Sequence, residues 1–198
     1  VTNFTDATGA NTSSYVIVAK VNGEEVDRTE PVSSWGNIFR RQTLDRPAGG
    51  TIGGAEYTYS PNDCSVGDVD GDGKYELIVK WDPSNSHDNS QSGYTGNVYI
   101  DAYKLNLDSE TPTKLWRIDL GKNIRAGAHY TQFLVYDFDG DGKAEVICKT
   151  AAGSKDGAGN YVSEAATDAT IKAVNNTKDW RNSSGKVTGG QEWLTVFN

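Results

Sequence analysis

Two short acidic segments carry the residues whose types and spacing could do chemistry. Asp68–Glu76 and Asp137–Glu145 each place Asp at positions one, three and five, Gly at position six and Glu at position nine. Calcium takes six to eight oxygen ligands, and alternating Asp residues in a tight turn can direct their carboxylates to one centre. The spacing therefore predicts two calcium sites, with ligands from the side chains of Asp68, Asp70, Asp72, Glu76, Asp137, Asp139, Asp141 and Glu145 and the backbone carbonyls of Lys74 and Lys143.

Two other interpretations of these segments are an EF-hand and a metal-free acidic turn. An EF-hand needs a bidentate Glu at position twelve and a helix on either side. Position twelve is Val79 in one segment and Cys148 in the other, and β-rich sequence follows both. Asp and Gly are common in metal-free turns, but four carboxylates this close repel one another strongly without a cation. We therefore expect calcium loops that each join two strands of a sheet and have a structural role.

The acidic segments belong to a longer internal repeat. Short apolar stretches precede them at 64–67 and 133–136, and strands are expected after them at 77–80 and 146–149. A third expected strand at 96–103 matches 190–197, with the extra residues of the second copy in a surface loop at 154–189. A fourth strand is expected at 114–120 in the first copy only. Four antiparallel strands per repeat are typical of β-propeller blades, and two blades cannot close a ring, so we expect the chain to be incomplete.

The first thirty residues predict a different β-structure. A strand is expected at 15–21, Asn22-Gly23 is a strong hairpin turn signal, and a second strand is expected at 24–28. Because a lone hairpin is marginally stable, this region is interpreted as the end of a small β-sandwich, followed by a linker from Glu30-Pro31. Many Gly, many aromatic residues and short β-branched runs favour an all-β protein.

Composition excludes some partners. The formal net charge of −8 argues against a nucleic-acid partner, and no run approaches the ~18 apolar residues of a membrane span. Cys64 and Cys148 are isolated in apolar strands. Buried free thiols are favoured for them, and a disulfide remains open.

Strand direction places a second group of polar and aromatic residues together, at the end of each hairpin opposite the acidic turn. These residues are Tyr59–Asp63 and Lys80–Asp82 in the first repeat, and Ala128–Thr131 with Lys149-Thr150 in the second. Aromatic rings beside fixed polar groups suit sugar recognition. Packing between blades is the alternative for Tyr59 and Trp81, and a structural role is favoured for His129. Lys80 and Lys149 recur at one blade position, which favours a structural ion pair.

Several non-repetitive stretches resemble the rhamnogalacturonan lyases of polysaccharide lyase family eleven. The resemblance rests on 57–73, on Lys80–Asn85 and on Gly121–Phe133, and it extends over essentially the whole chain. It implies an eight-bladed propeller that binds several calcium ions, of which about two blades are present at 35–198. It also implies that 1–34 are the end of a fibronectin type III-like β-sandwich domain and linker.

The same resemblance implies a secreted, extracellular enzyme. Its substrate is rhamnogalacturonan I, the pectin backbone, and it cleaves the rhamnose-(1→4)-galacturonate bond by β-elimination. Asn62 and Asp82 match family residues that contact the sugar, and the alternative for Asp82 is that it caps the turn through Pro83-Ser84-Asn85. The catalytic residues are expected in later blades, so none is assigned, and the chain alone is expected to be inactive without the remainder of the propeller.

The alternative function is a non-catalytic one. Integrin-type adhesins use similar calcium loops in propeller blades, so the loops are equally compatible with a calcium-dependent carbohydrate-binding or adhesin propeller. Lys and Arg on the ligand face of later blades would favour the lyase.

Overall fold

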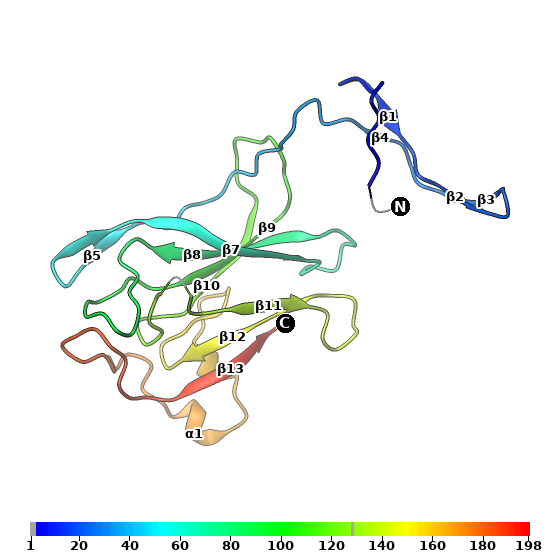
Figure 1. Ribbon diagram of the computed structural model, residues 1–198. Coiled ribbons are helices and arrows are strands. Elements are labelled where there is room, and N and C mark those ends of the chain that lie inside the picture. The colour runs from blue at the N-terminus through cyan, green and yellow to red at the C-terminus, as the bar shows by residue number, and fades with distance from the viewer. Residues whose placement is uncertain (1–2, 128) are drawn as a thin grey trace. The chain divides into compact units, whose positions relative to one another are not determined.

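The computed structural model describes residues 3–127 and 129–198 (Figure 1). Ala128, which the sequence places on the ligand face, lies outside the described residues. The chain divides into two compact units, one running to Gln42 with Leu107–Ser109 and one formed by Thr43–Asn106 and Glu110–Asn198. The structure is all-β with almost no helix, as the composition predicts.

The first unit consists of two small antiparallel pairs. Strands β2 (Val18–Val21) and β3 (Glu24–Arg28) form the expected hairpin, and β1 (Ser14–Tyr15) pairs with β4 (Val32–Ser33). The turn residues Asn22 and Gly23 have φ values of 53° and 88°, the left-handed conformation that a tight hairpin turn requires. The single strand predicted over 15–21 is wrong. Ile17 interrupts it and donates its N–H to the Thr29 side chain at 3.0 Å.

The second unit contains the predicted repeat as two sheets. The first sheet is a four-stranded antiparallel meander in the order β10-β9-β8-β7, and the second has the order β11-β12-β13. A separate hairpin, β5 (Gly50–Ile52) with β6 (Ala55–Tyr57), precedes them. The bounds of the sheet strands are β7 (Tyr59–Gly67), β8 (Glu76–Pro83), β9 (Tyr99–Tyr103), β10 (Lys114–Asp119), β11 (Phe133–Tyr136), β12 (Glu145–Ala151) and β13 (Glu192–Phe197).

Strands β7 and β8 are longer than the sequence predicts. They pair from Gly67 opposite Glu76 to Tyr59 opposite Pro83, with a register shift between Pro61 and Cys64. This shift is a β-bulge, which leaves extra residues unpaired and redirects their side chains. The residues that were expected just before the first strand (Tyr59–Asp63) and at the end of the second (Lys80–Asp82) therefore lie within β7 and β8.

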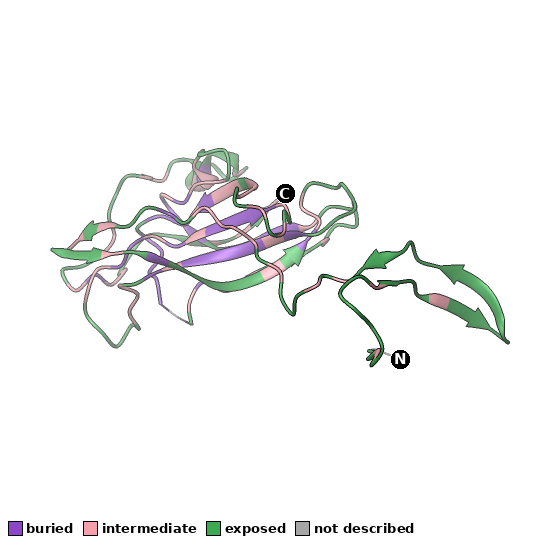
Figure 2. Ribbon diagram, turned by 90° about the horizontal axis from the view of Figure 1, so that it is seen from above, coloured by how far each residue is buried: buried purple, intermediate pink, exposed green. Residues whose placement is uncertain are grey.

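The main core lies between the two sheets. Residues of the first sheet such as Ile78, Ile100 and Ile118 pack with Val146 and Cys148 of the second. The opposite face of the first sheet buries a second cluster of Tyr59, Val79, Trp81 and Tyr103. Both faces of the first sheet are therefore covered, which explains why its central strands are buried in Figure 2.

The stretch at 154–189 is more than the surface loop that was expected. It contains a 3-10 helix at Val162–Ala165 and the short helix α1 (Ala169–Lys172), and it buries Ser154 and Ser163. It also reaches the first repeat, since Lys155 bridges to Asp119 at the end of β10. We call residues 154–189 the insertion.

Both cysteines are free, as favoured, but only Cys148 is buried. Its pKa is raised to about 12 by desolvation. Cys64 is exposed on β7, so the prediction that both are buried is wrong. No helix in the described part of the chain has the length and apolar character needed to cross a membrane.

Candidate metal sites and ligand-binding face

The first acidic loop connects β7 to β8 and folds around one carboxylate. The Asp68 side chain accepts backbone N–H hydrogen bonds from Gly71 at 2.7 Å and from Gly73 at 2.8 Å. Both glycines have positive φ values, 76° and 82°, which a Cβ would disfavour. Glu76 is 1% exposed, and one of its oxygens accepts the N–H of Val69 at 3.0 Å.

The second loop, between β11 and β12, repeats this arrangement. Asp137 accepts from the N–H groups of Gly140 at 2.7 Å and Gly142 at 3.0 Å. Glu145 is 2% exposed and accepts from Phe138 at 2.8 Å. Two turns 69 residues apart in sequence therefore share these internal hydrogen bonds.

Each loop gathers three carboxylates that could hold a metal ion. In each group, one oxygen from each residue lies within 4.8 Å of the others. An all-oxygen set of ionised ligands suits a hard divalent cation. The two groups are Asp68, Asp70 and Glu76 in the first loop and Asp137, Asp139 and Glu145 in the second.

An unpartnered oxygen shows that the second group fits a cation. Oε1 of Glu145 is buried and has no hydrogen-bond partner among the described residues, although its other oxygen is bonded. A buried carboxylate oxygen without a partner costs free energy, which a metal ion would offset. The remaining predicted ligands, Asp72, Lys74, Asp141 and Lys143, lie outside the three-residue groups and stay predictions.

A lysine outside the acidic motif changes the electrostatics of the first loop. The Lys104 ammonium, just after β9, lies 2.6 Å from Asp70 and 2.7 Å from Asp72. Its hydrogen bond lowers the pKa of Asp72. Burial has the opposite effect on Glu76 and raises its pKa. The motif gave no signal for Lys104, because it lies 28 residues beyond the loop.

The two predicted sugar-contact residues lie at the far end of the β7–β8 hairpin. Asp82 pairs with Ser60 in the strand register, whereas Asn62 lies in the bulge between Pro61 and Cys64. Asn62 is exposed and Asp82 is half-buried. An Asp82 oxygen accepts from the Ser86 hydroxyl at 2.7 Å. This contact is what a turn-stabilising role for Asp82 would require.

The recurrent lysines form ion pairs, as the sequence predicts. Lys80 has a side chain that is 2% exposed and lies 2.6 Å from Asp63 in the bulge. It also donates to the backbone carbonyl of Tyr130 at 3.2 Å, which joins the two repeats. Its counterpart Lys149 pairs with Glu192 at 2.9 Å, and both of these side chains are 49% exposed.

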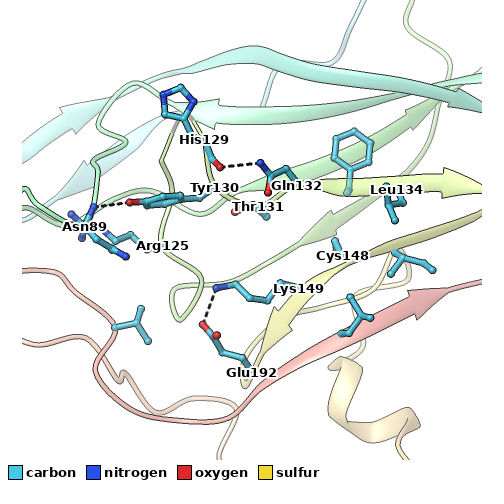
Figure 3. A pocket seen from close by; sticks show the side chains of 14 residues that line it. Asn89, Arg125, His129, Tyr130, Thr131, Gln132, Leu134, Cys148, Lys149 and Glu192 are labelled. Carbon is cyan, nitrogen blue, oxygen red and sulfur yellow. Dashed lines mark hydrogen bonds and ion pairs between the residues drawn. The ribbon is translucent and has the colours of Figure 1, made fainter.

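Lys149 lies in a hollow of about 590 Å³ beside the second sheet (Figure 3). Arg125, His129 and Tyr130 also line it, and the Tyr130 hydroxyl accepts the N–H of Asn89 at 2.8 Å. The hollow thus combines cationic, aromatic and polar groups with the apolar side chains of β11 and β13.

With this geometry established, comparison with known proteins identifies the family. A model of the "Rhamnogalacturonan lyase family 11, C-terminal domain" matches residues 39–198. The chain belongs to this family.

Relatives of known structure match nearly the whole chain. From Bacillus subtilis (strain 168), rhamnogalacturonan endolyase YesW is 58% identical over 99% of this chain and 29% of its own length. Rhamnogalacturonan exolyase YesX, from the same organism, is 50% identical over 99% of this chain and 30% of its own. The solved structure of a Bacillus licheniformis rhamnogalacturonan lyase, PL11, has a TM-score of 0.79 and 53% identity over 98% of this chain and 31% of that one. The chain thus spans about three tenths of the length of these family members.

Sequence reasoning missed Arg125, although it lies in a stretch that carries the family resemblance. This residue is 8% exposed, and no carboxylate pairs with it in the part of the chain that the structure describes. Its guanidinium instead donates to five backbone carbonyls and so joins the β8–β9 connection to the insertion. The acceptors are His87, Asp88, Gln91, Gly93 and Gly185.

The Lys80 ion pair gives an asymmetric stability prediction. Asp63→Ala leaves the buried Lys80 ammonium with only the Tyr130 carbonyl as a partner within the residues that the structure describes, and we expect the unfolding free energy to fall by about 1–3 kcal/mol. Lys80→Met should cost less, because the Asp63 side chain is 60% exposed and stays hydrated. Urea unfolding of both variants measures the difference. The double variant should recover part of the Asp63→Ala loss, and a larger loss for Lys80→Met than for Asp63→Ala would contradict this account.

Proposed function

We propose that this chain is part of a secreted, extracellular polysaccharide lyase. The enzyme cleaves the rhamnose-(1→4)-galacturonate bond of rhamnogalacturonan I by β-elimination. Family membership over residues 39–198 is the observation that carries the proposal. Its relatives are named rhamnogalacturonan lyases, and they include both an endolyase and an exolyase.

The two sheets are the first blades of a calcium-binding β-propeller, completed by the remainder of the parent protein. Residues 1–34 are the end of a fibronectin type III-like domain with its linker, and 35–198 belong to the propeller. The Lys80 position supports stacking of blades, because Lys80 is buried against the second repeat while Lys149 is half-exposed. A following blade would cover Lys149 together with Leu134 and Leu194, which are 61% and 78% exposed.

Calcium is the cation proposed for both acidic loops. The carboxylates of Asp68, Asp70 and Glu76, and those of Asp137, Asp139 and Glu145, would hold it, with Asp72, Asp141 and the carbonyls of Lys74 and Lys143 as further ligands. Bound calcium would neutralise the clustered carboxylates. Its role in this chain is to hold the two hairpins closed, far from the sugar-binding end.

The reaction needs groups beyond Asn62 and Asp82. A base removes the proton at C5 of galacturonate, the C4–O4 bond breaks, and its electron pair leaves on O4 with the rhamnose, where O4 takes up a proton and becomes a hydroxyl. The C5–H electrons become the C4=C5 double bond, and a cationic group stabilises the charge that develops on the carboxylate. Asn62 and Asp82 of this chain bind the sugar, and the base and the charge-neutralising residue belong to later blades. The 198-residue chain alone should therefore be inactive.

The lyase reaction has a distinctive product. When the intact parent protein is incubated with rhamnogalacturonan I, we expect oligosaccharides that carry an unsaturated uronate. They absorb in the ultraviolet and are one water molecule lighter than the products of hydrolysis, so absorbance and mass spectrometry identify them. Saturated products would refute β-elimination. Binding to the polysaccharide without cleavage would favour the non-catalytic propeller.

Calcium should stabilise the second unit. At a calcium concentration one hundred times the dissociation constant, each site adds about 2.7 kcal/mol, so the melting temperature should rise with calcium and fall again with a chelator. Asp137→Asn should remove part of this rise. Asp156→Asn is the matched control, since Asp156 also accepts two backbone N–H bonds, at 2.9 and 2.8 Å, but lies outside the acidic loops. A melting temperature that does not change with calcium concentration would contradict the assignment of the two acidic loops as calcium sites.

Asp82 should bind a neutral sugar such as rhamnose, because the galacturonate carboxylate would repel it. In the intact parent protein, Asp82→Ala should weaken substrate binding by about 1–3 kcal/mol, the cost of lost charged hydrogen bonds. Ser86→Ala is the control, because it removes the same 2.7 Å contact without removing the carboxylate. KM and melting temperature are measured for both. If both variants lower the melting temperature equally and leave KM unchanged, Asp82 stabilises the turn and does not bind the sugar.

A further inference from the structure

The two acidic loops are in direct contact. The backbone N–H of Ala144 in the second loop donates to the backbone carbonyl of Asp68 in the first, at 2.7 Å. Asp68 belongs to the first carboxylate group, and Ala144 immediately precedes Glu145 of the second. This hydrogen bond therefore connects the backbone of a candidate ligand, Asp68, to the residue that precedes another, Glu145.

Side-chain packing reinforces the connection on both sides. A Cβ on Gly67 would lie 2.8 Å from the Cβ of Ala144, so there is no space between the chains at that point. A Cβ on Gly71 would lie 2.9 Å from a side-chain carbon of Lys143. A shift of the second loop would consequently displace residues on either side of Asp68.

The two loops differ in how their negative charge is balanced. Lys104 supplies an ammonium to the first loop, within 2.7 Å of two carboxylates. The strand register makes Asn198 its counterpart, because Leu77 pairs with Tyr103 as Val146 pairs with Phe197.

No ion pair with Lys, Arg or His reaches the second group of carboxylates within residues 3–127 and 129–198. Its Glu145 also keeps an unpartnered buried oxygen. The negative charge of the second loop is therefore less well balanced by the protein than that of the first loop, so a bound cation would stabilise the second loop more.

We propose that the two loops are a coupled pair of divalent-cation sites. The second loop binds more tightly, and its occupation raises the affinity of the first. The inference rests on the cation-binding part of the proposed function. A cation on Glu145 fixes the backbone at Ala144, and this N–H then holds the Asp68 carbonyl in place. The first loop, already ordered, gives up less conformational entropy when it binds.

Linkage makes this proposal quantitative. If a cation in the second loop raises the affinity of the first loop by some factor, a cation in the first loop must raise the affinity of the second loop by the same factor. Isothermal titration of the 198-residue chain with calcium measures each affinity separately when one loop is disabled. Asp139→Asn disables the second loop and reports on the first, and Asp70→Asn does the reverse.

In the unsubstituted chain we expect two resolved binding steps. Asp139→Asn should weaken the remaining site by about five-fold or more relative to the second step of the unsubstituted chain. Two equal, independent affinities that the substitutions leave unchanged would overturn the inference. Absence of any calcium binding would overturn it together with the calcium assignment, so the two failures are distinguishable.

Two further variants test the coupling and the asymmetry without removing a carboxylate. Gly67→Ala forces the loops apart and should reduce the coupling factor towards one, with both sites still binding and with circular dichroism checking the fold. Lys104→Gln removes the competing ammonium and should raise the affinity of the first loop only. A coupling factor that is unchanged in Gly67→Ala would refute the proposed linkage. A first loop whose calcium affinity falls in Lys104→Gln would refute the proposed order of the two affinities.

Discussion

Negative charge concentrated in two tight turns is the constraint on which the rest of this fold depends. Each turn must close a pair of strands while it holds four carboxylates within a few residues. Asp68 and Asp137 relieve part of the problem locally, because each accepts backbone N–H groups of its own turn. The turns thereby fix the strand register at Gly67 opposite Glu76 and Tyr136 opposite Glu145. That register in turn decides which side chains face the second sheet, since a slip of one residue would exchange the two faces.

The elements that the sequence predicted well are those whose signals are local. The Asn22-Gly23 turn, the acidic loops and the four strands of the first repeat each follow from turn chemistry and short β-branched runs within a few residues. The interruption at Ile17 was missed because a side chain, that of Thr29, replaces a strand partner there. The exposed position of Cys64 was missed because it depends on what covers β7, which a strand pattern does not specify.

In the candidate sites, too, the sequence predicted the features with local signals and missed those that depend on distant contacts. Carboxylate positions in the loops follow from spacing, so the groups of three were predictable. The electrostatic partners were not, because Lys104 and Arg125 meet their acceptors only through the packing of strands and loops that are distant in sequence. The recurrence of Lys80 as Lys149, 69 residues later, predicted an ion pair. Asp63 was not predicted as the partner, because its position depends on a bulge that the residue pattern does not indicate.

The insertion has a consequence for the order in which the molecule assembles. It belongs by sequence to the second repeat, yet Lys155 pairs with Asp119 and Gly185 accepts a hydrogen bond from Arg125. Asp119 and Arg125 both precede the second sheet in sequence. These contacts span 36 and 60 residues, so the entropy of closing long loops must be met before they form. The insertion should therefore become protected from amide hydrogen exchange only after the β7–β8 and β11–β12 hairpins exist. Its ordering thus reports that the first repeat is already in place.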